Sequence, residues 1–465
     1  MANSKTLIRD FTSGSVAKKL IVFAAPLFLS NMLQVVYNMV DMVIVGQVTG
    51  DVGISAVSVG GDIAHFLVFL AMGFSNAGQV IIAQYIGAGQ RNKLGRFIGT
   101  MFMFLFTCAI VLSAACLLLR NQILQIMSTP AAAWDGAMVY SCTCMVGLAF
   151  TYGYNMVSAV LRGMGDSRHP FLFISIAAVL NIILDVLFVM VFRWGPFGAA
   201  LATVIGQAVS FISAAVFLVR RRAQFGFEIS RADFRIHGDM LSGLLRLGVP
   251  MAILSASVQF SKLFVNSWIN SYGVIVSAVS GVGNKLNLIG NQISNAMNTA
   301  GASMIGQNVG AKKYDRVTRI VLTVLAINSS LALVMIAALL LFPAQIFGIF
   351  GSTDAMLAVA MTFLPIGVLN LCSSALRSGA NSFIHGTGSS HINFLTAILD
   401  GLLLRIGLSL LFGLVLRMEY FGFWLGDAVA SFTPFPIGLI YFLSGRWKTR
   451  NAISEGKKAD DGEPA

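Results

Sequence analysis

Two aspartates, Asp41 and Asp185, lie in stretches that are otherwise apolar and long enough to cross a lipid bilayer. A carboxylate inside hydrocarbon is costly, so such a residue usually faces a cavity or a partner and marks an ion or proton pathway. Tyr37 and Asn181 lie one helical turn before them, on the same helix faces. Oxygen ligands suit a hard cation, and two neighbouring carboxyl groups can share one proton at neutral pH. These residues therefore predict a site for H⁺ or Na⁺.

The elements that position them are membrane-spanning helices. Of the 465 residues 57% are hydrophobic and 11% charged, whereas about a quarter of a soluble protein is charged. Apolar stretches of about 20 residues recur along the chain, and the short alternating segments of a β-barrel are absent. We predict an all-α polytopic membrane protein with twelve transmembrane helices, at about 19–48, 53–85, 97–119, 135–161, 170–192, 197–219, 243–270, 274–308, 318–342, 356–383, 392–416 and 420–444.

The first, fifth and sixth of these helices would bring polar side chains to one depth. If the N-terminus is cytoplasmic, Asp41 lies about 10 Å from the outer end of the first helix at 1.5 Å per residue. Asp185 and Thr203 then lie at a similar level. The predicted proton or Na⁺ ligands are Asp41, Asp185, Asn181 and Thr203, with Tyr37 beside them; no other metal site and no cofactor are expected. The alternative is that the acids pair with a basic residue or cap a broken helix. The N-terminal spans contain no lysine or arginine, which weakens the ion-pair alternative.

The basic residues indicate how the chain is oriented. Most of the 31 lysines and arginines, Arg377 counted among them, fall in segments on the same side as the N-terminus. The opposite side carries three, Arg120, Arg193 and Arg417. This asymmetry predicts a multi-pass protein of the plasma (inner) membrane with both termini in the cytoplasm. It also explains the net charge of +12 without nucleic acid as a partner.

The sequence repeats itself once. LRGMGDSRHPF at 161–171 aligns with IHGTGSSHINF at 384–394, and Pro26 corresponds to Pro250. Six helices per half place both halves in the same orientation, so they would be two six-helix bundles related by a pseudo-two-fold axis along the membrane normal. The predicted segments are a cytoplasmic N-terminal segment 1–18, an N-lobe 19–219, a cytoplasmic linker 220–242, a C-lobe 243–444 and a cytoplasmic tail 445–465.

Charged residues also lie within the C-terminal spans. They are Lys262, Lys285, Asp400, Arg405 and Asp427. One interpretation is a network of buried ion pairs that locks four helices together. The other is that a lysine contacts substrate or responds to the N-lobe carboxylates, which would admit anionic or zwitterionic cargo.

The motifs AAPLFLSNMLQVVYNMVDMVIVGQ (24–47), IAQYIGAG (82–89), LRGMGDSRHP (161–170) and NIILD (181–185) resemble those of the multidrug and toxic compound extrusion (MATE) family. The resemblance covers nearly the whole chain and implies two bundles around a central cavity. It matches the N-lobe cation site of DinF-like members at the five residues above. It further implies that ion binding bends the first helix at Pro26, where a backbone hydrogen bond is missing. NorM-like members carry acids in the C-lobe that contribute to a second cation site, whereas this chain has Lys262 and Lys285 at comparable depths there, which argues against a second Na⁺ site.

These observations predict a secondary antiporter that exports amphiphilic, often cationic compounds in exchange for H⁺ or Na⁺. The nearest alternative is a flippase for lipid-linked oligosaccharides or peptidoglycan precursors, for which a more basic cavity is expected. The sequence contains no Walker A, HExxH or GxSxG motif, so we expect neither ATP-driven transport nor an enzyme. The expected partners are small amphiphilic substrates and membrane lipids, and the expected state is a monomer.

Overall fold

The computed structural model describes residues 7–348 and 354–449. The parts of the predicted terminal segments at 1–6 and 450–465 lie outside the described residues. Within the described part the chain is helical and contains no β-strand. This arrangement follows from the sequence, because a backbone in hydrocarbon has to satisfy its polar groups within each helix.

The chain divides into two compact units. Unit 1 comprises Met1–Asp10 and Ala25–Gly248, and unit 2 comprises Phe11–Ala24 and Val249–Ala465. The predicted lobes, 19–219 and 243–444, were defined by where the chain enters and leaves the membrane, and these boundaries stay a prediction. Residues 11–24 belong to unit 2 because polar side chains there hold them. The side chains of Asn308 and Arg316 both donate to the Phe11 carbonyl, at 3.1 and 2.9 Å.

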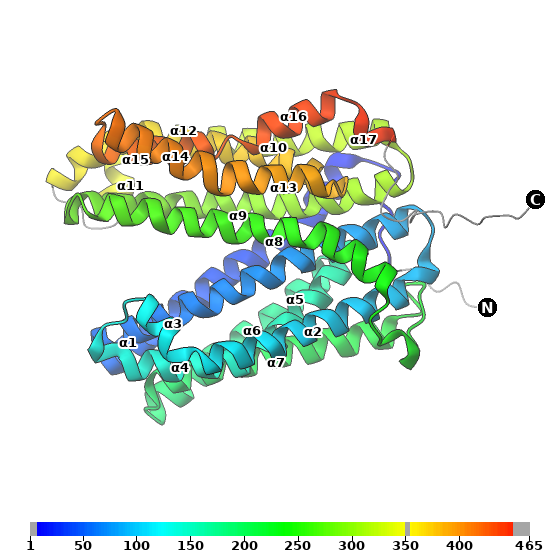
Figure 1. Cartoon of the computed structure of the whole chain (residues 1–465), viewed down its shortest axis with the longest axis horizontal. Coiled ribbons are helices and arrows are strands. Elements are labelled where there is room, and N and C mark those ends of the chain that lie inside the picture. The colour runs from blue at the N-terminus through cyan, green and yellow to red at the C-terminus, as the bar shows by residue number, and fades with distance from the viewer. Residues whose placement is uncertain (1–6, 349–353, 450–465) are drawn as a thin grey trace, which may run out of the picture. The chain divides into compact units, whose positions relative to one another are not determined.

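Unit 1 contains the helices α2, α5, α6 and α7, which run side by side in Figure 1. Its helices are most of α1 (Val16–Gly87), α2 (Leu94–Leu118), α3 (Arg120–Ile126), α4 (Trp134–Val146), α5 (Leu148–Gly163), α6 (Arg168–Asp185) with the π-helical turn η3 (Val186–Val191), α7 (Gly195–Arg221) and the start of α8 (Gly238–Asn270). Three short 3₁₀ turns, η1 (Arg91–Lys93), η2 (Ala131–Ala133) and η4 (Arg231–Asp233), lie in the connections.

The 72-residue α1 is two helices joined at Gly50. Gly50 has φ 63° and ψ −157°, a conformation that is essentially restricted to glycine. Gly46 and Ile54, on either side of this point, pack against each other, and a β-carbon at Gly46 would lie 2.7 Å from the Ile54 side chain. The two parts of α1 are the first and second predicted helices.

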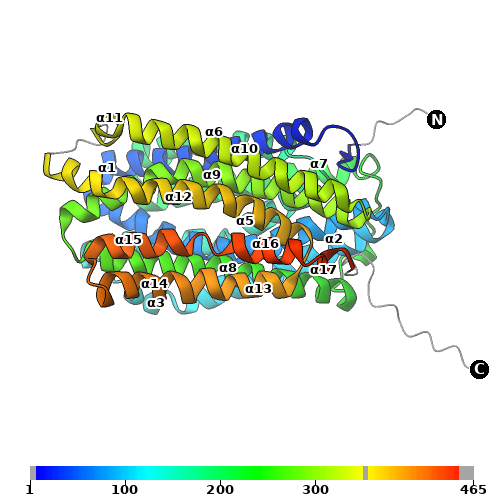
Figure 2. The ribbon, with the colours of Figure 1, turned by 90° about the horizontal axis from the view of Figure 1, so that it is seen from above.

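Unit 2 contains α9, α10 and α12, which pack against one another, and α14, which packs against α15 (Figure 2). Its helices are the rest of α8, α9 (Val274–Gly310), α10 (Tyr314–Leu341), α11 (Pro343–Gly348), α12 (Asp354–Gly386), α13 (Ser390–Ile398) with π-helical η5 (Leu399–Leu404), α14 (Arg405–Leu410) with π-helical η6 (Leu411–Val415), α15 (Glu419–Ala430), α16 (Pro434–Leu443) and α17 (Arg446–Thr449).

Nine helices of the described chain are long and apolar enough to cross a membrane, or ten if α4 and α5 form one bent span. α1 counts once in this total although it is two helices, and the 37-residue α9 is not counted although it is long enough. With these two, the elements correspond to the twelve predicted helices. The prediction of an all-α polytopic membrane protein is confirmed.

Several predicted helices are broken in ways that the hydropathy pattern does not show. The fourth bends by 49° between α4 and α5, at Gly147. A side chain there would collide with Val204 of α7, since a β-carbon would lie 2.4 Å from it. The fifth and eleventh helices contain π-helical turns, and the twelfth is interrupted before Pro434.

Candidate functional site

Three elements of unit 1 bring the predicted N-lobe residues together. α1 supplies Tyr37 and Asp41, α6 supplies Asn181 and Asp185, and α7 supplies Thr203. Asp41 is 4% exposed and Asp185 is fully buried. Spacings of four residues put each pair on one helix face, so two helices present an acid and a second polar group to the same interior point.

The polar groups form a connected chain of contacts. The Thr203 hydroxyl donates to an Asp41 oxygen at 3.4 Å, and the Asn181 amide donates to the Thr203 hydroxyl at 3.5 Å. The carboxyl groups of Asp41 and Asp185 are close enough to interact electrostatically. The structure therefore places all four predicted ligands in one cluster.

The two carboxyl groups have more acceptor atoms than donors. Among the described residues, no group donates to either Asp185 oxygen or to the second oxygen of Asp41. Two ionised carboxylates only accept hydrogen bonds, so their contact is favourable when a proton or a cation lies between them. No lysine or arginine of the described chain forms an ion pair with either acid. The alternative that the acids pair with a basic residue is therefore wrong.

A small cavity of about 10 Å³ lies beside the acids. Tyr37, Asn181, Thr203 and Gln207 line its polar side, and Gly206 and alanines of α6 line the rest. A polar cavity needs roughly 10–15 Å³ to hold one water molecule. This space suits a single small species, such as a water molecule or a dehydrated Na⁺, rather than an organic substrate.

The sequence analysis did not identify two residues that lie near the acids. Gln207 faces Tyr37 in the cavity and lies one turn after Thr203 on α7, so helical spacing from Thr203 would have found it. Tyr140 of α4 lies within electrostatic range of both acids. No spacing signal in the sequence connects Tyr140 with them.

An apolar cluster adjoins the acids in the chain direction of α1 and α6. It comprises Ile44, Val45, Val57, Tyr140, Val189, Ala199 and Ala200. Ile44 and Val45 follow Asp41 within one turn, and Val189 follows Asp185 by four residues. These side chains exclude water from one side of the site, which strengthens electrostatic interactions there. Val189 lies in the π-helical turn η3, which begins directly after Asp185; such turns are frequent at functional sites.

The charged residues of unit 2 form a separate network. Arg405 is fully buried, and its guanidinium donates to Asp400 at 2.8 Å and also to Asp427. Lys262 lies within electrostatic range of this group. Lys285 is exposed. Ion pairs of the predicted network are present among Asp400, Arg405 and Asp427, and Lys262 lies near them without an ion pair.

Arg377 is placed differently from our prediction. We count it with the cytoplasmic basic residues, but it lines a cavity inside unit 2 and interacts electrostatically with Asp400, Asp427 and Arg405. The reason is that α12 continues to Gly386, so Arg377 lies about 13 Å before the end of that helix at 1.5 Å per residue.

Comparison with known proteins identifies the family. The MatE family profile matches residues 26–187 and 250–411, two stretches of equal length that cover most of the chain. The chain belongs to the MatE family. The double match agrees with the repeat seen in the sequence and places Pro26 and Pro250 at the first residue of each copy.

Relatives within this family cover most of the chain. YpnP of Bacillus subtilis, a probable multidrug resistance protein, is 31% identical over 66% of this chain and 68% of its own length. NorM of Thermotoga maritima, with the same description, is 22% identical over 94% of this chain and 95% of its own. The multidrug export protein MepA of Staphylococcus aureus is 20% identical over 84% of this chain and 86% of its own.

Solved structures share the fold. An outward-facing multidrug resistance MATE family transporter of the MOP superfamily matches with a TM-score of 0.86 at 20% identity, over 95% of this chain and 98% of that one. A MOP superfamily transporter from Pyrococcus furiosus, described as having a binding pocket of reverse polarity, matches with a TM-score of 0.85 over the same shares. At this identity the likeness establishes the helical transporter fold of this MatE protein.

Proposed function

We propose that this chain is a secondary multidrug efflux antiporter that exports amphiphilic, often cationic compounds and takes up H⁺ or Na⁺ in exchange. Asp41 and Asp185 carry the coupling ion, Asn181 and Thr203 complete its ligands, and Tyr37 borders them. The names of the relatives support the export of drugs, since YpnP, NorM and MepA are all described by multidrug resistance or export.

The observation that carries the proposal is that two buried carboxyl groups lie within electrostatic range of each other, and that three of their four oxygens have no hydrogen-bond donor among the described residues. The pair is stable with a bound proton or cation and is repulsive without one. Loss of the ion therefore raises the free energy of this arrangement and favours another one. A carrier requires this differential affinity between two states to couple an ion gradient to transport.

Proline positions suggest where α1 and α8 change shape. α1 passes from unit 2 to unit 1 between Ala24 and Ala25, directly before Pro26, and α8 passes from unit 1 to unit 2 directly before Pro250. Proline removes one helical hydrogen bond, so each helix is weakest close to the residue where it changes unit. We propose that binding of the coupling ion changes the bend of α1 at Pro26.

The proposal also covers the oligomeric state, the membrane, the topology and the cofactor requirement. The protein acts as a monomer in the plasma (inner) membrane with both termini in the cytoplasm, and it uses no cofactor. A flippase for lipid-linked precursors is the second candidate, because the cationic cavity of unit 2 suits an anionic head group.

Reconstituted liposomes test the proposal. Purified protein should move an ethidium-type dye against its gradient when an opposing pH or sodium gradient is imposed, and the gradient that supports movement identifies the ion. Dye movement that ignores both gradients would rule out an antiporter. Movement of a fluorescent lipid-linked sugar, with no dye movement, would favour the flippase.

A further inference from the structure

A second cavity lies within unit 2, remote in sequence from the acid pair. It has a volume of about 280 Å³ and lies between α8, α9, α12 and α15. Binding sites for drug-sized molecules span roughly 300–1,000 Å³, so this space suits one part of an amphiphile rather than a whole drug. Nothing in the proposed coupling site uses it.

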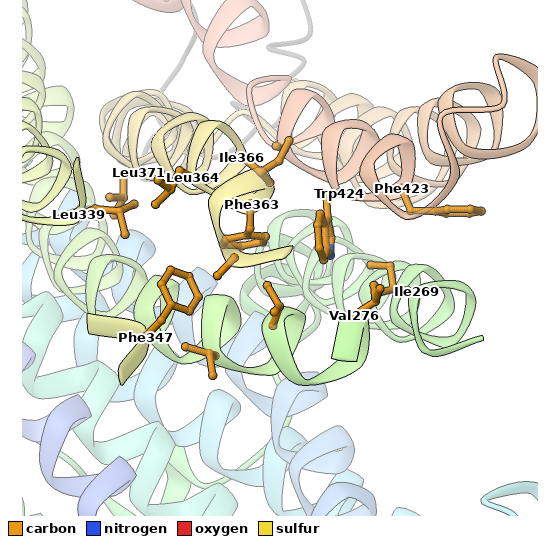
Figure 3. Packing of buried hydrophobic residues seen from close by; sticks show 14 of the residues in the cluster. Ile269, Val276, Leu339, Phe347, Phe363, Leu364, Ile366, Leu371, Phe423 and Trp424 are labelled. Carbon is orange, nitrogen blue, oxygen red and sulfur yellow. The ribbon is translucent and has the colours of Figure 1, made fainter. Parts of the chain in front are cut away.

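One wall of the cavity is apolar. Phe363, Ile366, Leu371 and Trp424 line it and belong to a larger buried cluster, which Figure 3 shows in close view. The rings of Phe363 and Trp424 meet edge to face with their centres 5.1 Å apart. This wall gives an aromatic or aliphatic group a surface to pack on.

The lining also contains many polar residues and carries net positive charge. Lys262 of α8 and Arg377 of α12 line the cavity, and the acid among the lining residues is Asp427. Arg405 donates to Asp427 and to Asp400, so it neutralises much of the charge of both acids. The five groups together hold three positive and two negative charges, which leaves one formal positive charge in excess.

Neither Lys262 nor Arg377 has a direct polar partner among the described residues. In the described part of the chain, the Lys262 ammonium and the Arg377 guanidinium have no ion pair within 4.0 Å and no hydrogen bond. Both interact with Asp400 and Asp427 only through longer-range electrostatics. Both side chains are half-buried, and a cation in such a cavity without a hydrogen-bonded counter-charge is incompletely compensated, so a ligand that supplies an anion gains free energy here.

Carboxamides and hydroxyls complete the polar lining. Most come from α8, α9 and α12, and they include Gln259, Asn266, Asn291 and Ser374. Some already have partners: the Ser374 hydroxyl oxygen lies 3.2 Å from the Asn291 side-chain oxygen and 2.8 Å from the Ser294 hydroxyl, and its one hydrogen can serve either of them.

We infer that this cavity binds the anionic group, a carboxylate or a phosphate, of an amphiphilic substrate, with Lys262 and Arg377 as counter-charges and the Phe363–Trp424 wall against its apolar part. The inference rests on the proposed export function and names its substrate class as zwitterions and anionic amphiphiles. An organic cation without an anionic group can still be exported, but it gains no counter-charge from these residues.

A matched pair of dyes tests the inference. Rhodamine B has a free carboxylate and its ethyl ester does not, while the cationic ring system is the same. Binding to the purified protein in lipid nanodiscs is measured by fluorescence anisotropy, with empty nanodiscs as the blank. The carboxylate should give roughly ten- to a hundredfold tighter binding, the range that one or two hydrogen bonds to a charged group provide.

Single substitutions assign the preference to the cavity. Lys262→Gln and Arg377→Gln should each reduce the preference for rhodamine B and leave binding of the ester unchanged. Lys285→Gln removes an equal charge from an exposed position of α9 and should leave the preference intact. Equal affinities of the wild type for both dyes, or a preference that both cavity variants retain, would overturn the inference.

Two further measurements keep the outcome clear. If a cavity variant fails to fold, benzoate competition against bound rhodamine B, with benzamide as the neutral control, tests the same claim on the wild-type protein; no displacement by benzoate overturns it. Gradient-driven efflux of the ethyl ester tests the proposed export function without the anion site. Ester efflux without a carboxylate preference leaves the function and removes the inference.

Discussion

At the scale of residues, the sequence predicted the acid cluster better than its surroundings. The cluster of Asp41, Asp185, Asn181 and Thr203 was predictable. A charged side chain inside hydrocarbon is costly and therefore usually functional, and helical spacing places Asn181 on the same face as Asp185. Tyr140 was not predictable, since the bend between α4 and α5 determines what it faces. Arg377 was misplaced because its depth depends on where α12 ends.

Arg405 is a buried charge whose partners contribute to the stability of unit 2. It is fully buried and donates to Asp400 and Asp427. Asp400→Asn should lower the free energy of unfolding by about 3–5 kcal/mol, because it leaves a buried charge with one fewer counter-charge. Unfolding of the purified protein in mixed micelles measures this effect.

The exposed Lys285 offers the control for that experiment. Lys285→Gln should change stability by no more than about 0.5 kcal/mol, as is usual for surface substitutions. Equal stability of the Asp400→Asn and Lys285→Gln variants would contradict the network described here.

At the scale of elements, hydropathy located the helices and missed their irregularities. Long apolar stretches predicted each span, since about 20 apolar residues suffice to cross a bilayer. The π-helical turns η3, η5 and η6 depend on packing between neighbouring helices, which a hydropathy window does not record. Glycines at close contacts mark these places more directly than hydropathy does.

Two glycines of adjacent helices make a matched pair of tests. A β-carbon at Gly426 of α15 would lie 2.4 Å from the backbone of Ser409, whereas one at Gly407 of α14 would meet nothing within 4 Å. Gly426→Ala should destabilise the protein by about 1–3 kcal/mol through overpacking. Gly407→Ala should be neutral or stabilising by up to about 1 kcal/mol, since alanine favours a helix over glycine. Thermal unfolding that ranks the two variants in the opposite order would contradict this packing.

At the scale of the whole molecule, the internal repeat predicted two similar halves, and the distribution of basic residues predicted the orientation in the membrane. The repeat is confirmed by the double match to the MatE profile. The orientation stays a prediction, because hydropathy and fold alone do not determine which side of the membrane a loop faces. The positive-inside rule is the physical argument for it.

Fusion reporters test the orientation. Green fluorescent protein attached after residue 465 should fluoresce in a bacterial host, because it folds in the cytoplasm. Alkaline phosphatase at the same position should be inactive, since it needs the oxidising periplasm to form its disulfides. An active phosphatase fusion with a dark fluorescent fusion would place the C-terminus outside and refute the charge argument.

The central claim is that Asp41 and Asp185 together bind the coupling ion. Its most direct test is gradient-driven dye efflux by purified Asp41→Asn and Asp185→Asn in liposomes, beside the wild type. Each variant should lose roughly 5- to 150-fold in energised efflux, the range that coupling free energies of about 1–3 kcal/mol give, while it still inserts and folds. Undiminished efflux by either variant under the same gradient would contradict the claim.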